Sequence, residues 1–142
     1  MPVPFALEVI QRTLRSHSTL FLHDPPFQYI LRERTTPLVL RTMQRSQQEW
    51  AVSLRLCHLT CTLLTVYSSK LRTESEILLA MLSKDLLNEA APIWQRALAL
   101  ETFRVVLQAV TTQTGQSTSS PAPSLSPLTL TLTPAHIPHP SP

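Results

Sequence analysis

Apolar side chains recur through the first hundred residues at intervals of three and four, the spacing of one face of an α-helix. In the first such segment, one face carries Ala6, Val9, Ile10, Thr13 and Leu14, and the other carries Glu8, Gln11, Arg12 and Arg15. This separation of apolar from polar positions predicts an ordinary amphipathic helix.

The second segment opens with HDPPFQYI, in which Asp24 can cap a helix and Pro25 can occupy its first position. Its apolar face is formed by Phe27, Ile30, Leu31 and Leu38. Pro37 lies inside the segment and removes one backbone hydrogen bond. We therefore expect the helix to end or kink near Thr36, giving a bend or two short helices.

The third segment, from about residue 48 to 69, is the most apolar part of the chain. Its main stripe consists of Val52, Leu56, Leu59, Leu63 and Val66. Three further residues, Leu54, Cys61 and Leu64, widen the stripe until most of the circumference is apolar. Such a helix needs neighbours on more than one side, so we expect it to be the central helix.

The fourth and fifth segments form the span TESEILLAMLSKDLLNEAAPIWQRALALE. Thr73 and Glu76 have the spacing of a capping box and predict the start of a helix that ends near Asn88. Pro92 marks the first turn of the next helix. The expected apolar faces are Ile77, Leu78, Met81 and Leu82 in the fourth segment, and Ile93, Ala97, Leu100 and Leu107, with Trp94 and Phe103 beside them, in the fifth.

Five helices joined by short links predict an all-α fold in which consecutive helices are antiparallel. Stacked helix pairs of about 35 to 45 residues are typical of HEAT and armadillo solenoids. A closed helical bundle is the alternative. The single glycine, Gly115, argues against strand-turn folds and phosphate-binding loops, which need glycine for unusual backbone angles. The expected core is Leu56, Leu59, Leu63, Ile77, Leu78, Met81, Trp94, Ala97 and Leu100.

The carboxyl-terminal part differs in composition from the rest. The last charged side chain is Arg104, and seven of the 13 prolines follow it among serine and threonine. A segment with few apolar residues and many prolines cannot build a core. We therefore assign residues 1–110 to a helical module and residues 111–142 to a disordered tail. Ser120 and Ser126 precede proline and fit a phosphorylation site or an adaptor ligand, but an inert tail is the simpler interpretation.

The charge distribution is only a weak indication of binding to nucleic acid or to an anionic membrane surface. The net charge is +3, and the arginines are interleaved with acids and glutamines, as on a solvated face. The amino terminus lacks the features of a secretory signal. The apolar stretch LCHLTCTLLTVYSS is too short and too polar to span a bilayer, which needs about 20 apolar residues. We expect a soluble, cytosolic protein in a reducing compartment.

Candidate sites for chemistry each have a simpler explanation. Cys57, His58 and Cys61 are one ligand short of a zinc site, and adjacent helical residues point apart, which disfavours a pair of thiol and base. Capping and a solvated surface account for the carboxylates of Glu74, Glu76 and Glu101. The histidines His17, His23, His136 and His139 are isolated or lie in the tail. We predict no catalytic residue, no cofactor and no metal, and we assign no binding residue.

Three strings, LRERTTPLVL, TESEILLAML and WQRALALE, occur in an order that resembles the amino-terminal region of the Mon-two trafficking family. The resemblance extends from about Phe5 to Arg104. This family is related to the large Golgi guanine-nucleotide exchange factors for Arf GTPases, and it shares their dimerisation and cyclophilin-binding (DCB) and HUS regions.

The resemblance implies a non-enzymatic, cytosolic helical-repeat scaffold. It implies peripheral attachment to trans-Golgi and early endosomal membranes, where the scaffold regulates transport between endosomes and Golgi. The implied partners are a Dopey-family protein, a phospholipid flippase, Arf-like GTPases and a second copy of the chain, with no nucleic acid. Two alternatives are a generic HEAT or armadillo adaptor and a regulatory piece of an Arf exchange factor.

The sequence departs from the family pattern in two places. RTMQRSQQEW is shorter than the family's linker between the second and third helices, and the similarity fades after Arg104. We therefore expect a short isoform or a fragment of a longer solenoid. Its last packed helix would then expose an apolar face that further repeats would cover.

Overall fold

The computed structural model describes residues 2–45 and 49–117, with side-chain environments up to residue 112. The described part is helical and contains no strand, which confirms the predicted all-α class. The elements are α1 (Val3–Ser16), α2 (Ser18–His23), α3 (Pro25–Ile30), a π-helical turn η1 (Leu31–Thr35), α4 (Thr36–Arg45), α5 (Trp50–Val66), α6 (Arg72–Leu87) and α7 (Ile93–Ser117).

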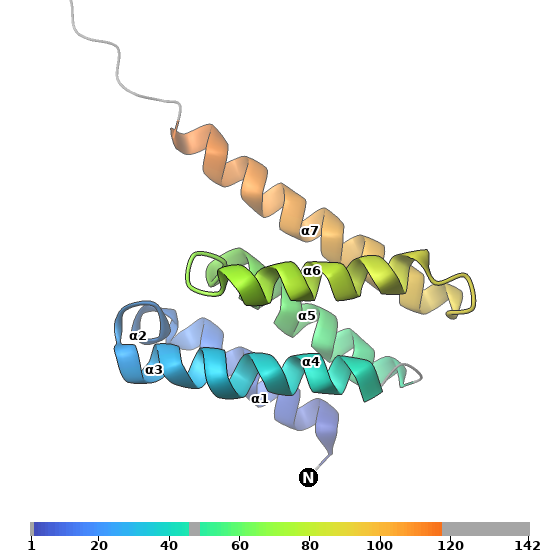
Figure 1. Cartoon of the computed structure of the whole chain (residues 1–142), viewed down its shortest axis with the longest axis horizontal. Coiled ribbons are helices and arrows are strands. Elements are labelled where there is room, and N and C mark those ends of the chain that lie inside the picture. Colours follow the sequence, from blue (N-terminus) through green and yellow to red (C-terminus); the bar gives the residue numbers. More distant parts are fainter. Residues whose placement is uncertain (1, 46–48, 118–142) are drawn as a thin grey trace, which may run out of the picture.

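Helix α5 lies at the centre of the arrangement. It packs against α1, α4, α6 and α7, and α6 packs against α7. In Figure 1, α4 and α6 lie at the front, with α5 behind and between them, and α5 contacts both. Helices that follow one another in the chain contact one another, as expected for stacked helical hairpins.

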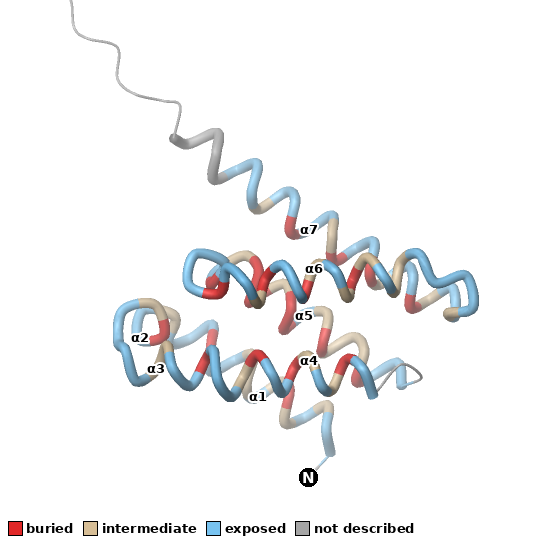
Figure 2. Tube along the Cα trace, viewed as in Figure 1, coloured by how far each residue is buried: buried red, intermediate tan, exposed pale blue. Residues whose placement is uncertain are grey.

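The core follows the predicted stripe of α5 closely. Leu56, Leu59 and Leu63 are buried, as predicted, and so are Val52 and Leu64 (Figure 2). Residues of the other helices complete this cluster, namely Leu7, Leu14, Phe21, Leu31, Val39, Met43, Tyr67, Leu71, Leu78, Leu82 and Val106. The central position of the third segment is therefore confirmed. Only its last stripe residue, Val66, is exposed, because the helix ends there.

A buried hydrogen bond joins the carboxyl ends of α1 and α5. The Tyr67 hydroxyl donates to the backbone carbonyl of Leu14 at 2.6 Å. The Tyr67 ring also meets the edge of Phe21 at a centroid distance of 6.3 Å, and Phe21 meets Phe27 at 5.3 Å. Residues that are far apart in the sequence are thus fixed together at this end of the molecule.

The segment before Pro37 forms a π-helical turn that separates α3 from α4, so the predicted interruption near Thr36 is confirmed, although helical backbone runs on through it. The Thr36 N–H donates to the Leu31 carbonyl, five residues back, and the Thr36 hydroxyl donates to the same oxygen at 3.0 Å. A π turn contains one extra residue, so it rotates the following helix relative to the preceding one. Val39 is consequently buried, while the predicted Leu38 is half exposed.

The same segment shows smaller differences at its start. Pro25 begins α3, as predicted, and Asp24 occupies the capping position, but its side chain makes no capping hydrogen bond. Ile30 is exposed, and Phe27 is partly buried. In α1 the buried residues are Leu7 and Leu14, whereas the predicted face included Val9 and Thr13, which are exposed. Leu7 and Leu14 are seven residues apart, so they share the side of α1 that packs on α5.

The capping box predicted at Thr73 and Glu76 is absent. Leu71 is the capping residue of α6, no side chain caps the helix, and α6 begins before Thr73. Leu71 is fully buried, so packing rather than a hydroxyl sets this boundary. The first-turn carboxylate that is used is Glu74, which pairs with Arg32 of η1 at 2.9 Å. The predicted end of α6 near Asn88 is confirmed.

The apolar faces of α6 and α7 were predicted less well than that of α5. In α6, Leu78 and Leu82 are buried and Met81 is partly buried, but Ile77 is 45% exposed. In α7, which begins directly after Pro92 as predicted, Ile93, Ala97, Leu100 and Leu107 all face solvent. The buried residues of α7 are Gln95, Ala99, Thr102 and Val106. Small side chains on this second face suit close packing against α5 and α6.

Candidate interaction surface

The side chains that could carry chemistry lie in separate places or are held in an unreactive form. Cys57 and Cys61 are partly buried on α5, whereas His58 between them is exposed. Burial raises the pKa of the Cys57 thiol, and it raises the pKa of the Cys61 thiol to about 11. Such thiols are protonated near neutral pH, and a protonated thiol is a poor nucleophile and metal ligand. Within residues 2–45 and 49–117 no group of histidine, cysteine and carboxylate side chains could hold a metal ion.

The carboxylates considered as a catalytic pair lie in separate environments. Glu74 pairs with Arg32, whereas Glu101 accepts a hydrogen bond from the Arg104 guanidinium at 2.8 Å. That hydrogen bond lowers the pKa of Glu101. Glu76 is exposed on α6. Ser120, Ser126, His136 and His139 lie outside the described residues. Glu74 and Glu101 therefore serve in ion pairs, a role that the sequence did not indicate, whereas Glu76 lies on the solvated surface, as predicted.

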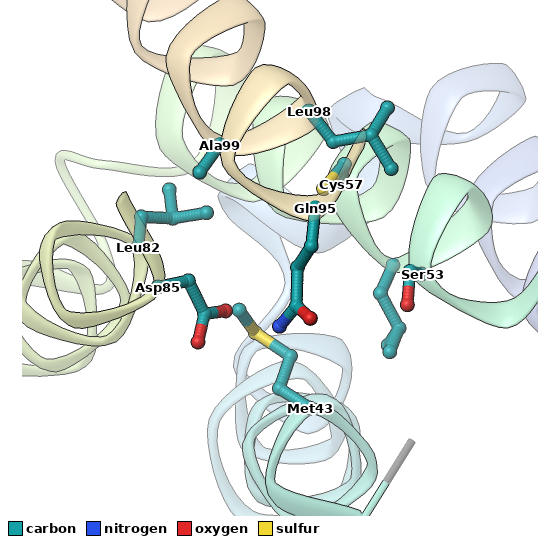
Figure 3. Close-up of a pocket in the computed structure, with 9 residues that line it drawn as sticks. Met43, Ser53, Cys57, Leu82, Asp85, Gln95, Leu98 and Ala99 are labelled. Carbon is teal, nitrogen blue, oxygen red and sulfur yellow. The ribbon is translucent and has the colours of Figure 1, made fainter. Parts of the chain in front are cut away.

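A small cavity lies where α4, α5, α6 and α7 meet. Figure 3 shows the side chains that surround it, with Asp85, Gln95 and Met43 converging from three helices. The Gln95 side chain forms a hydrogen bond with Asp85, yet burial dominates and raises the pKa of that carboxyl. The cavity volume is about 30 Å³, which is the space of one or two water molecules. A substrate does not fit, so this junction has a structural role.

The most conspicuous surface feature is the outward side of α7. Ile93, Leu100 and Leu107, which we call the α7 stripe, are 85%, 59% and 61% exposed. Their spacing of seven residues places them on one side of the helix, over a length of about 21 Å at 1.5 Å per residue. Figure 2 shows most of the described part of α7 in the colour of exposed residues. A row of exposed apolar side chains of this kind is a candidate protein-interaction site.

The α7 stripe was visible in the sequence but was assigned to the wrong environment. Leu100 was predicted to be core, and Ile93 and Leu107 were predicted to share its apolar face, because these residues form the more apolar of the two faces of α7. The signal for the other face was a row of small or polar residues, Ala99 and Thr102 among them, at the same helical spacing. The expectation that the last packed helix exposes an apolar face agrees with this geometry.

Comparisons with known proteins agree with the helical architecture. The family model described as Mon2/Sec7/BIG1-like, HUS domain, matches residues 1–113. The chain is 30% identical over 112 residues to Protein MON2 of Saccharomyces cerevisiae, covering 76% of this chain and 7% of that protein. It is 30% identical over 116 residues to the Protein MON2 homolog of Drosophila melanogaster and 28% identical over 116 residues to that of Homo sapiens, covering 68% and 70% of this chain and 7% of each relative.

Three further findings accompany these likenesses. No solved structure matches the chain. None of the helices in the described residues has the length and apolar character needed to cross a membrane. The chain spans about 7% of the length of the curated relatives that it matches. The family match nevertheless covers most of the chain, so the resemblance drawn from its sequence is confirmed. The chain belongs to the Mon2/Sec7/BIG1-like HUS domain family, whose members are related to the Arf exchange factors of membrane traffic.

Proposed function

We propose that the chain is a non-catalytic scaffold or regulator of traffic between endosomes and Golgi, which acts by binding proteins on its helix surfaces. The observation that carries this proposal is the α7 stripe, an aligned apolar surface at the edge of a helical stack. Family membership supports the setting in membrane traffic. The protonated thiols and the dispersed carboxylates support a role in binding rather than in catalysis.

The proposed partners follow from the family resemblance. They are a Dopey-family protein, a phospholipid flippase and Arf-like GTPases, and these partners would hold the chain peripherally at trans-Golgi and early endosomal membranes. The α7 stripe is the surface on which we expect the first of these to bind. A helix or helical repeat of the partner would bury Leu100 at the centre of the contact, since the most consequential contacts lie near the centre of an interface.

A pull-down from cell extract with a triple variant tests this surface. Ile93→Gln, Leu100→Gln and Leu107→Gln together replace the stripe without touching the core. A matched triple variant, Leu20→Gln, Tyr29→Gln and Ile77→Gln, alters exposed apolar residues on other elements. Enrichment of a Dopey-family protein by the original chain and by the matched variant, but not by the stripe variant, is the expected result. Absence of that protein from a pull-down with the well-folded original chain would contradict the proposal.

A nucleotide-exchange assay tests the absence of catalysis separately. The purified chain is incubated with Arf proteins that carry a fluorescent guanine nucleotide. We expect the release rate to equal that of Arf alone. Accelerated release by this chain would overturn its assignment as non-catalytic and would favour a piece of an active exchange factor.

A further inference from the structure

A groove runs between α1 and α4 on the side of the molecule away from α7. Its volume is about 790 Å³. The lining residues are Val3, Ala6, Leu7, Ile10, Leu38, Arg41, Thr42, Arg45, Glu49 and Val52. Leu7 and Val52 are buried and form its floor, whereas Val3 and Leu38 are about half exposed at its walls. The groove therefore presents apolar surface along its length.

The dimensions of the groove suit an α-helix. Its walls are formed by residues 3–10 of α1 and 38–45 of α4, two helical turns each, so it is about 10 Å long at 1.5 Å per residue. The groove is partly open to solvent, so an occupant would lie against its walls and would not be enclosed by them. Walls of this length can contact about two turns of a further helix that lies between them.

The charge at the groove is positive along one wall. Arg41 and Arg45 lie one turn apart on α4, both are exposed, and neither forms an ion pair within the described part of the chain. Glu49, at the start of α5, is the single acidic residue among the lining residues described. An acidic group on the α4 side of an occupant would thus face two arginines, which bind carboxylates with good geometry.

We propose that this groove binds an acidic amphipathic helix of a partner protein. The apolar side of that helix lies against Ile10 and Leu38, with its acidic residues along the edge that faces Arg41 and Arg45. A concave apolar channel with one cationic wall matches the helix-in-groove mode of recognition. A bilayer surface is flat on this scale and does not enter such a channel. The groove and the α7 stripe lie on different elements, so a test of one binding proposal does not test the other.

Binding of synthetic helices to the full chain tests the proposal by fluorescence anisotropy. The acidic probe is a labelled peptide of about 16 residues, long enough to form a helix on its own. It carries leucines at helical spacing on one face and two glutamates one turn apart beside them. The basic probe is identical except that lysines replace the glutamates. We expect saturable binding of the acidic probe that weakens as salt is added.

Charge reversal on the protein provides the decisive comparison. Arg41→Glu with Arg45→Glu should weaken binding of the acidic probe at least tenfold and should create binding of the basic probe. The matched control, Arg34→Glu with Arg72→Glu, makes the same change in net charge at exposed positions outside the groove and should leave the affinity unchanged. Leu38→Gln tests the apolar wall independently and should also weaken binding of the acidic probe.

Several outcomes would overturn the proposal. These are no saturable binding of the acidic probe, equal loss in both double variants, or an affinity that Leu38→Gln and the groove charge reversal leave unchanged. Competition by vesicles containing phosphatidylserine that the groove charge reversal abolishes would assign the cationic surface to a membrane instead. Circular dichroism of each variant confirms that a loss of binding does not arise from unfolding. Failure of these tests would leave the α7 stripe and its pull-down unaffected.

Discussion

Helices α5 and α7 both carry clear apolar stripes, but only one of these stripes is buried. The stripe of α5 includes Leu56, Leu59 and Leu63, all in the core. The stripe of α7, at Ile93, Leu100 and Leu107, faces solvent, while Gln95, Ala99, Thr102 and Val106 of the same helix face inward. Apolar periodicity therefore shows that a helix has an apolar side. The neighbours of the helix decide whether that side is buried or exposed.

The number of neighbours explains the difference. Helix α5 contacts four other helices, so nearly every apolar side chain on it meets another. Helix α7 lies at the edge of the stack and contacts α5 and α6 through one side. Its small residues permit close approach to these helices, and the larger apolar residues are left outside. A stripe on an edge helix is thus a candidate interaction surface, whereas a stripe on a central helix is core.

The same substitution should strongly reduce the free energy of unfolding on α5 and leave it nearly unchanged on α7. This is the largest difference that we expect. Leu59→Asp places an unpaired carboxylate at a fully buried position, which costs several kcal/mol against a total stability of about 5 to 15 kcal/mol. We expect loss of the cooperative thermal transition by circular dichroism. Leu100→Asp, the matched control on α7, should stay within about 0.5 kcal/mol of the original chain. A melting temperature of Leu59→Asp within a few degrees of the original would refute the central burial of α5.

A smaller loss is expected at the buried end of α5. Tyr67→Phe removes the hydroxyl that donates to the Leu14 carbonyl and leaves that oxygen without its side-chain partner. The cost of losing such a hydrogen bond is about 1 to 2 kcal/mol. Urea denaturation should show a lower midpoint with an unchanged slope. A midpoint equal to that of the original chain would mean that this contact does not help to hold α1 on α5.

The junction beneath α7 should respond to pH in a defined direction. Burial raises the pKa of Asp85 above its usual 3.8, so the folded chain binds this proton more tightly than the unfolded chain does. The stabilising contribution is complete at acid pH and is lost as the pH rises through the raised pKa. Asp85→Asn keeps an acceptor for Gln95 and removes the charge.

The variant Asp85→Asn should therefore melt at a higher temperature than the original chain at pH 7, and this advantage should shrink as the pH falls toward 4. Thermal denaturation of both chains across this range measures the difference. The gain should be smaller than the loss at Tyr67, because Asp85 is only partly buried. If the melting-temperature advantage of Asp85→Asn grew as the pH fell, the pKa of Asp85 would be lowered in the folded chain and not raised.

The smallest effect on stability is expected for the α7 stripe itself. The triple change of Ile93, Leu100 and Leu107 to glutamine removes exposed apolar area only, so each change should alter stability by no more than about 0.5 kcal/mol. The measurement is the melting temperature of the isolated chain. A large drop in melting temperature would show that other residues of the chain cover the stripe. The stripe would then not be available as an interaction surface.

The sequence alone determined the helical class, the central helix and several boundaries. Periodic apolar residues, the near absence of glycine, and prolines at positions 25 and 92 report on local backbone preference, which a linear reading can follow. The family could also be identified, because the diagnostic strings are contiguous. The assignment of residues 111–142 to a separate tail stays a prediction, since most of that stretch lies outside the described residues.

The tertiary structure decided the features that depend on partners far away in the chain. The π turn before Pro37 shifted the buried face from Leu38 to Val39, and the buried Leu71 displaced the expected capping box. Likewise, the groove between α1 and α4 arises because two helices separated in sequence border the same channel. Local spacing fixes which residues share a side of a helix. Only the packing of the helices fixes whether that side meets the core, a groove or solvent, because burial is a property of neighbours and not of the sequence position.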